Sequence, residues 1–290
     1  MAGMKRDLGI TFAGGGGRAF YQLGWLERYT DTLLPRIAAI AGCSAGSAMA
    51  AVWLSGRTEE TRAFFAQRRQ GVKSHMDLRR LFRGESPFPH DGIYRATIRH
   101  AMSEGGFERM KAHPFPVNIL CAGFPPVLPS GVSIALGLAA YQLEKKMRPK
   151  MLHPTFPRYV GFKQHTWDMR DCETPEDAVE LVISSSSTPP FTKRGRFEQR
   201  LLIDGSVIDN APAFLTEESP KVRRNLVLLT RPYPKAKLGQ RDSRLYIAPD
   251  QPLPISRWDY TENAPVDETL SAGRRDADRD EQLVAAFLNR

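Results

Sequence analysis

The stretch "LGITFAGGGGRAFYQLGWLERYTDTLL", residues 8–34, joins a short apolar run to a helical pattern through four consecutive glycines. The apolar run is rich in β-forming residues, and apolar residues recur at helical spacing after the glycines. Residues 36–56, "RIAAIAGCSAGSAMAAVWLSG", repeat the order, with a helix that Gly56 ends. Strands that alternate with helices predict an α/β fold with a mostly parallel sheet between helices.

The rest of the chain is less regular but carries further strand and helix signals. Thr174, Pro175 and Asp177 form the pattern of a capping box at the start of a helix. Thr58 is expected to cap a helix that begins at residue 59. Strands are predicted at residues 115–123, 200–204 and 225–231, and an amphipathic helix at residues 279–290.

Composition limits the class of protein. The 290 residues are 41% hydrophobic and 25% charged, as in ordinary globular proteins, and the formal net charge is +9. A basic surface suits lipid head groups, nucleic acid or an acidic protein, and it also serves solubility alone. Because no nucleic-acid reading module accompanies the charge, nucleic acid is not an expected partner.

The cysteines and the apolar segments indicate the compartment. Cys43, Cys121 and Cys172 are widely spaced and form no Cys-x-x-Cys pair, which argues against a disulfide framework and against a zinc site. The first 17 residues do not read as a signal peptide, and the apolar stretch at residues 131–143 is too short to span a bilayer. We therefore expect a cytoplasmic protein that can associate peripherally with a membrane.

The sequence "GCSAG", Gly42 to Gly46, matches Gly-x-Ser-x-Gly. Between a predicted strand and a predicted helix this pattern is typical of a nucleophile elbow, in which the strained turn exposes Ser44 beside a helix N-terminus. The two glycines let the strand and the helix approach closely. Ser44 is the candidate nucleophile.

A serine nucleophile needs a base, and the histidines are poorly placed to supply one. None follows residue 165, and neither His153 nor His165 sits at a predicted strand end. In "LLIDGS", Asp204 ends an apolar strand, and burial there would raise its pKa toward the useful range. Asp204 is the preferred base, although Asp-Gly also suits a surface turn. Asp209 is the second candidate.

The glycine run fits one of two kinds of anion site. An oxyanion hole needs backbone donors from a loop that approaches closely, and the loop would share the carboxyl edge of the parallel sheet with Ser44 and Asp204. A dinucleotide or P-loop cradle is disfavoured, because Ala19 stands where Gly-x-Gly-x-x-Gly needs glycine and no Gly-Lys-Ser/Thr follows.

Together "GGGGRAFYQLG", "GCSAG" and "DGS" resemble the three motifs of the patatin-like phospholipases, in the same order. The similarity covers roughly residues 8–232 and extends to "SSSSTPPF" (184–191) and "VIDNAP". The sequence departs from the family pattern at Ala19 and Ser206. The resemblance implies Ser44 as nucleophile and Asp204 as its base, without a metal or cofactor. The implied oxyanion donors are Gly15, Gly16, Gly17 and Arg18, and the glycines implied to support the motifs are Gly14, Gly42, Gly46 and Gly205.

The resemblance implies a three-layer α/β/α sandwich in one domain over residues 1–290. We expect a core at 8–232, an apolar and basic helical insertion at 124–160, and a C-terminal extension at 233–290 without assigned chemistry. The insertion suits a membrane-interface helix or a core helix, and the basic runs at 79–83 and 193–200 are expected to be solvated faces. The oligomeric state stays open.

The expected function is hydrolysis of fatty-acyl esters of phospholipids or lysophospholipids. Two alternatives remain at this point. One is a carboxylesterase or acyltransferase that acts on neutral lipids or thioesters. The other is a lipid-binding regulatory protein without turnover.

Overall fold

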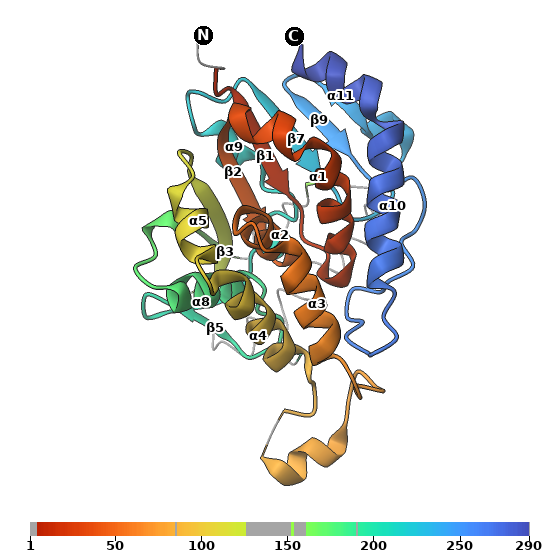
Figure 1. Cartoon of the computed structure of the whole chain (residues 1–290). Coiled ribbons are helices and arrows are strands. Elements are labelled where there is room, and N and C mark those ends of the chain that lie inside the picture. The colour runs from red at the N-terminus through yellow and green to blue at the C-terminus, as the bar shows by residue number, and fades with distance from the viewer. Residues whose placement is uncertain (1–4, 85, 126–151, 154–160, 190, 290) are drawn as a thin grey trace.

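The computed structural model describes residues 5–84, 86–125, 152–153, 161–189 and 191–289 (Figure 1). Its described strands form one mixed sheet in the order β5-β6-β3-β2-β1-β7-β9-β8, with β4 paired to β3 outside this path. The strands are β1 (Leu8–Phe12), β2 (Ile37–Cys43), β3 (Val117–Gly123), β4 (Lys163–Asp168), β5 (Gly195–Phe197), β6 (Arg200–Asp204), β7 (Arg224–Leu228), β8 (Gly239–Arg241) and β9 (Arg244–Ile247).

The centre of the sheet is parallel and its outer parts are antiparallel. β3, β2, β1, β7 and β9 run in one direction. β4 and β6 pair with β3 in the opposite direction, as β8 does with β9. The predicted α/β fold is confirmed, but the assumption that Asp204 ends a parallel strand is wrong because β6 is antiparallel. Its place at the site comes from the pairing register.

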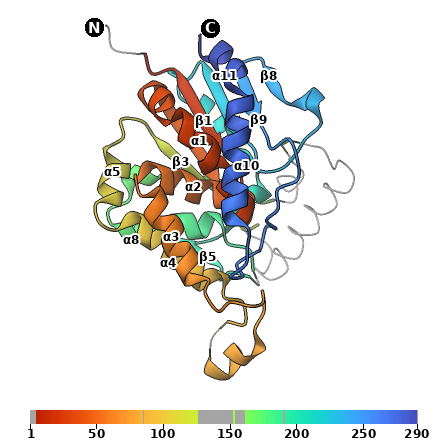
Figure 2. The same ribbon diagram turned by 45° about the vertical axis from the view of Figure 1, so that its right-hand side comes forward.

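Helices cover the sheet, and most of those described lie on one face (Figures 1 and 2). They are α1 (Phe20–Leu33), α2 (Ala45–Leu54), α3 (Thr58–Arg68), α4 (His90–Met102), α5 (Gly106–Ala112), α8 (Pro175–Ser185), α9 (Ala213–Glu217), α10 (Val266–Arg279) and α11 (Glu281–Leu288). Short 3₁₀ turns at residues 16–19, 34–36, 78–83, 169–171, 205–207 and 235–237 complete the described elements.

The alternation of side chains along the strands explains the layers. Leu226 and Leu228 of β7 pack in the large core beneath the helices, whereas Val227 packs in a separate cluster on the opposite face. On that second face, Thr11 bonds Asn225, whose amide donates to the carbonyl of Ala213 in α9. Since neighbouring residues of a strand point to opposite faces, α9 lies across the sheet from the main helical layer.

Local predictions can be compared directly with the structure. The capping box at Thr174 is present at the start of α8, with Asp177 as its partner. The expectation that Thr58 caps the next helix is wrong: Thr58 is the first residue of α3, and Arg57 is the cap position. The proposed interface helix at residues 130–150 falls outside the described residues. In the part of the chain that is described, no helix has the length and apolar character needed to cross a bilayer.

The segment after residue 232 is built into the sheet and the helical layer. β9 pairs in parallel with β7, and α10 lies along α1 (Figure 1). Tyr21 and Trp25 of α1 donate to Asp276 and Asp280 of this segment. These bonds fix the extension against α1, the helix that follows the glycine loop.

Candidate active site

Ser44 lies in a tight turn between β2 and α2. It is the residue directly after Cys43, and its φ of 52° and ψ of −137° are unusual for a residue with a side chain. A Cβ on Gly46 would lie 2.4 Å from the Phe12 carbonyl oxygen, and a Cβ on Gly42 would lie 3.0 Å from the Ser47 backbone. Bare backbone at these two positions therefore lets α2 approach the strands while the turn holds Ser44.

The Ser44 hydroxyl donates to Asp204 at 2.7 Å from Oγ to Oδ2. The register of the sheet brings the two together: Cys43 pairs with Leu120 on β3, and the next residue of β3, Cys121, pairs with Asp204 on β6. Ser44 and Asp204 thus meet at the same level across β3. The two residues that the sequence singled out as a dyad lie in direct contact.

Asp204 is buried, with 8% of its surface exposed. Burial raises the pKa of its carboxyl above the ordinary value, and hydrogen bonds offset part of this rise. Besides Ser44, the donors are the Ser206 N–H at 2.8 Å and the Thr188 hydroxyl at 3.2 Å. Arg257 also lowers the pKa through its charge. The net effect makes Asp204 a stronger proton acceptor than an exposed aspartate.

The serine run that precedes Asp204 holds the backbone of the elbow. The Ser44 N–H donates to both the carbonyl and the hydroxyl of Ser185, at 3.1 and 2.9 Å. The Ser185 hydroxyl in turn donates to the Leu120 carbonyl at 2.7 Å. The sequence pointed to this run only through its family resemblance, and the structure gives Ser185 a contact with the elbow.

The glycine loop follows β1 and is held at both ends. Gly14 exchanges hydrogen bonds with Asn210, and its carbonyl also accepts from Thr230 at 2.7 Å. Further along, the Gly17 N–H donates to the Arg257 carbonyl at 3.0 Å. Gly16 has φ +59°, and a Cβ there would lie 2.0 Å from the same carbonyl oxygen. The loop can adopt this path only with glycine at residue 16.

The elbow, Asp204 and the loop surround one cavity of about 80 Å³. Its wall consists of Gly15, Gly16, Ser44, Ala45, His90, Tyr94, Ser186, Thr188, Thr192, Asp204, Ser206, Val207, Asn210, Arg257, Trp258 and Tyr260. The Arg18 guanidinium bonds the Gly15 carbonyl at 3.3 Å. The sequence thus predicted the part of the cavity wall formed by the elbow, Asp204 and the glycine loop. The residues contributed by α4 and by the segment 257–260 were not predicted, because no local motif marks them.

A family model described as patatin-like phospholipase matches residues 10–216. The chain belongs to the patatin-like phospholipase family. The members of this family are lipid acyl hydrolases, as expected from the glycine loop, the Gly-x-Ser-x-Gly elbow and the Asp-Gly motif. Arg257, Trp258 and Tyr260, which line the cavity, lie beyond the matched range.

Several solved structures match this chain, and one of them is a distant relative at low sequence identity. The crystal structure of VipD from Legionella pneumophila matches at a TM-score of 0.47 with 11% sequence identity, over 98% of this chain and 67% of that chain. No curated protein sequence matches.

His90, at the start of α4, lines the cavity that contains Ser44 and Asp204. No pattern in the sequence predicted this position. Burial lowers the pKa of its imidazole, which keeps it neutral. Its Nε2 lies 2.9 Å from the Trp258 carbonyl and therefore carries the proton. Within the described structure its Nδ1 has no hydrogen-bond partner.

A second, apolar cavity adjoins the first. The two share Gly16, Ala45, Tyr94 and Tyr260 in their walls. The second cavity extends between α2, α3 and α4 and is lined by apolar side chains that include Met49, Val52, Phe65 and Ile98. The second cavity is small, at about 30 Å³, and its wall also contains the polar residues Thr58, Thr61 and Thr97.

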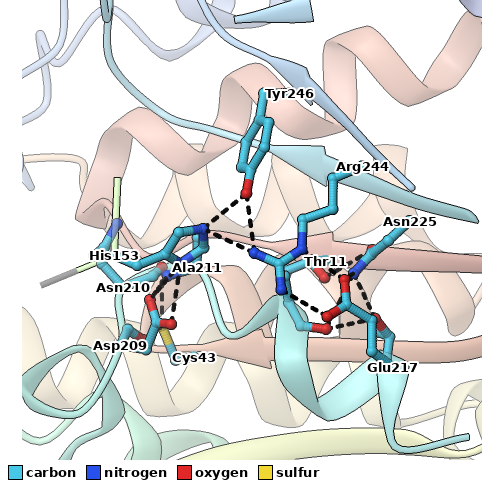
Figure 3. A network of polar contacts seen from close by, with 12 residues as sticks. Thr11, Cys43, His153, Asp209, Asn210, Ala211, Glu217, Asn225, Arg244 and Tyr246 are labelled. Carbon is cyan, nitrogen blue, oxygen red and sulfur yellow. Dashed lines mark hydrogen bonds and ion pairs between the residues drawn. The ribbon is translucent and has the colours of Figure 1, made fainter. Parts of the chain in front are cut away.

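Asp209, the second candidate base, bonds elsewhere (Figure 3). Its carboxylate lies 3.0 Å from Nδ1 of His153 and accepts from the Ala211 N–H at 2.9 Å. Nε2 of His153 lies 3.0 Å from the Tyr246 hydroxyl, which also accepts from Arg244. The network therefore ties the loop after Asp204 to β9.

His165 and Cys43, two further side chains that could take part in catalysis, make contacts that stabilise the fold. His165 lies in β4, pairs with Cys121 in the sheet register and stacks on Trp167. Burial raises the pKa of the Cys43 thiol well above its usual value, and Cys43 donates weakly to the carbonyls of Asp209 and Asn210. Among the residues with described positions, no group of His, Cys, Asp and Glu gathers that could hold a metal ion.

Proposed function

We propose that this protein hydrolyses fatty-acyl esters of phospholipids or lysophospholipids through an acyl-enzyme on Ser44. The observation that carries the proposal is the 2.7 Å hydrogen bond between Ser44 and a buried Asp204, both of which line one cavity. A hydroxyl is a weak nucleophile until a base removes its proton, and the carboxylate with a raised pKa is placed to do so.

In the first half of the reaction, the Ser44 oxygen attacks the ester carbonyl while Asp204 takes its proton. The tetrahedral intermediate collapses, the alcohol leaves with the proton from Asp204, and the fatty acid stays on Ser44 as an ester. In the second half, Asp204 takes a proton from water, the resulting hydroxide attacks the acyl carbonyl, and Ser44 regains a proton as the fatty acid is released.

The glycine loop supplies donors to the negative oxygen of each intermediate. Gly15 and Gly16 line the cavity beside Ser44, and the N-terminus of α2 adds the favourable end of a helix dipole. The Gly17 N–H is engaged by the Arg257 carbonyl, so its role is to fix the loop. Arg18 acts in the same way through its bond to the Gly15 carbonyl.

The acyl chain of the substrate is assigned to the apolar cavity between α2, α3 and α4. That cavity shares Ala45 and Tyr94 with the catalytic cavity and so adjoins Ser44, and its volume of about 30 Å³ limits it to the part of the chain nearest the ester. Burial of methylene groups there contributes about 0.8 kcal/mol each, which favours esters with hydrocarbon chains over small esters.

Labelling with a long-chain fluorophosphonate tests the nucleophile. We expect the wild type and the control Ser243→Ala, an exposed serine in the turn between β8 and β9, to label equally. Ser44→Ala is expected to abolish both labelling and hydrolysis of a lysophospholipid. Full hydrolysis by Ser44→Ala, or equal labelling of it, would contradict the proposal.

A further inference from the structure

Residues 255–260 form a strap over the catalytic cavity. The Arg257 carbonyl accepts the Gly17 N–H, and His90 donates to the Trp258 carbonyl. The Trp258 ring stacks on Phe191 with centroids 4.8 Å apart, and Ile255 is buried. The backbone of the strap is therefore fixed by contacts that do not involve the Arg257 side chain.

The Arg257 guanidinium brings a positive charge to the cavity. Arg257 lines the same space as Ser44 and Asp204, and its charge lowers the pKa of Asp204. Among the described residues of the wall, Asp204 is the other charged group, because burial keeps His90 neutral. Arg257 is thus the cation that a ligand in the cavity meets.

Asp204 is a poor partner for this cation. Its carboxylate already accepts hydrogen bonds from Ser206, Ser44 and Thr188. A guanidinium presents several donors in a planar fork and binds phosphate oxygens in pairs. The wall therefore offers an anion site a short distance from the nucleophile.

We infer that Arg257 binds the phosphate of the lipid substrate, an inference that rests on the proposed ester hydrolysis at Ser44. In a phospholipid only the glycerol carbons separate the phosphate from the scissile ester, so one small cavity can hold both. The phosphates of an acyl-coenzyme A lie much farther from the thioester. The site therefore favours phospholipids over neutral glycerides and over acyl-coenzyme A.

The test compares three substrates with the same acyl chain: lysophosphatidylcholine, monoacylglycerol and acyl-coenzyme A. The variants are Arg257→Gln, Arg257→Lys and the control Arg241→Gln on exposed β8. The pH profile of each variant is measured, so that a change in the pKa of Asp204 is distinguished from a loss of phosphate binding. For Arg257→Gln we expect a fall of about 10- to 100-fold in kcat/KM on lysophosphatidylcholine, a change of less than about 3-fold on monoacylglycerol, and partial rescue by lysine.

Five results would overturn the inference, three from the variants and two from the wild type. An equal fall on all substrates would assign Arg257 to the reacting oxygen or to the loop. An unchanged kcat/KM on every substrate would mean that Arg257 does not bind the substrate. A fall confined to acyl-coenzyme A would mean that Arg257 binds a phosphate of coenzyme A and not that of a phospholipid. Wild-type activity on monoacylglycerol alone refutes the phosphate site and leaves the hydrolase standing, whereas wild-type inactivity on all three esters refutes both.

A separate observation concerns the described residues between α3 and α4, residues 73–84 and 86–88. Figures 1 and 2 show this segment extending away from the sheet beyond the ends of both helices. It carries Met76, Leu78 and Phe82, which are 48%, 57% and 93% exposed. The other large apolar side chains that stand exposed in the described structure are Leu201 and Leu283. The expectation that residues 79–83 form a merely solvated face does not account for this group.

The base of the segment adjoins the cavity wall. Phe88 packs on both His90 and Phe191, and His75 stacks near His90. The apolar residues are accompanied by the exposed cations Lys73 and Arg79. Apolar side chains among cations suit the interface of an anionic bilayer, where the former enter the acyl boundary and the latter meet head groups.

We propose that residues 73–83 dock the protein on anionic membranes. Sedimentation with vesicles of phosphatidylcholine and phosphatidylserine tests this without reference to turnover. Leu78→Ser/Phe82→Ser is expected to lower the bound fraction at least 5-fold, and the matched control Leu201→Ser/Leu283→Ser to leave it unchanged. An unchanged bound fraction in the first variant, or an equal loss in the control, would overturn the proposal.

Discussion

Replacing Asp204 with asparagine separates activity from stability at a single buried position. Asparagine keeps the shape of the side chain and can still accept the Ser206 N–H, which lies 2.8 Å from Oδ1. It cannot take the Ser44 proton. Loss of a general base costs about 10²- to 10⁴-fold in rate, or about 2.7–5.4 kcal/mol of activation free energy.

Although Asp204→Asn should lose activity, its free energy of unfolding at neutral pH should be equal to or higher than that of the wild type. Three hydrogen bonds to the carboxylate contribute about 1.5–3 kcal/mol each, whereas desolvation of a buried ion costs several kcal/mol. Because the folded pKa of Asp204 is raised, desolvation outweighs the bonds. Its contribution to stability is complete below the unfolded value of 3.8 and is lost as the pH rises through the folded pKa.

We therefore expect Asp204→Asn to unfold at or above the wild-type temperature at pH 7, with the difference vanishing below pH 3.8. Calorimetry across this range and lysophospholipid hydrolysis at pH 7 are the measurements. Asp209→Asn is the control, because Asp209 is also buried but bonds His153. The reasoning fails if Asp209→Asn loses as much activity as Asp204→Asn, or if Asp204→Asn unfolds at a lower temperature at pH 7.

Further predictions follow from the same contacts. The wild-type kcat/KM should fall as the pH drops through the raised pKa of Asp204, so the midpoint of the acid limb should lie above 3.8, and a midpoint at or below it would contradict the burial argument. Ser185→Ala should lower kcat severalfold in steady-state assays with little change in KM, because it removes a hydroxyl that bonds the backbone of Ser44; an unchanged kcat would count against this role. Met49→Trp should shift the preferred acyl chain in a chain-length series toward shorter esters, and an unchanged preference would move the acyl site elsewhere. Gly46→Ala should cost about 1–3 kcal/mol in denaturant unfolding, since its Cβ meets the Phe12 carbonyl; an unchanged midpoint would mean that α2 can shift freely.

The sequence predicted the parallel half of the sheet because that half follows local patterns. β1 (Leu8–Phe12) and β2 (Ile37–Cys43) are short apolar strands that end in glycine-bearing turns, and each is followed by a helical pattern. The placement of Ser44 needed only this local order. Asp204 was selected by its position at the end of an apolar run, which does not reveal whether a strand is parallel or antiparallel.

The sequence could not predict the cavity walls, because they depend on contacts between distant segments. His90 follows no motif, and Arg257 lies in a proline-rich stretch without periodicity. His90 and Arg257 lie in the same cavity because His90 donates a hydrogen bond to the carbonyl of Trp258, which is 168 residues away in the sequence. Likewise, His153 shows no strand-end context, and only the fold brings it to Asp209 and Tyr246.

The division between the matched region and the C-terminal extension has a consequence for specificity. Ser44, Asp204 and the glycines lie within residues 10–216, whereas the strap that holds Gly17 and carries Arg257 lies outside. The extension is fixed independently of the site by the bonds from α1 to Asp276 and Asp280 and by the pairing of β9 with β7. Substitutions in the strap can therefore change the wall of the cavity while the Ser44–Asp204 contact is kept. In this protein we expect the matched region to set the reaction and the extension to select which lipid undergoes it.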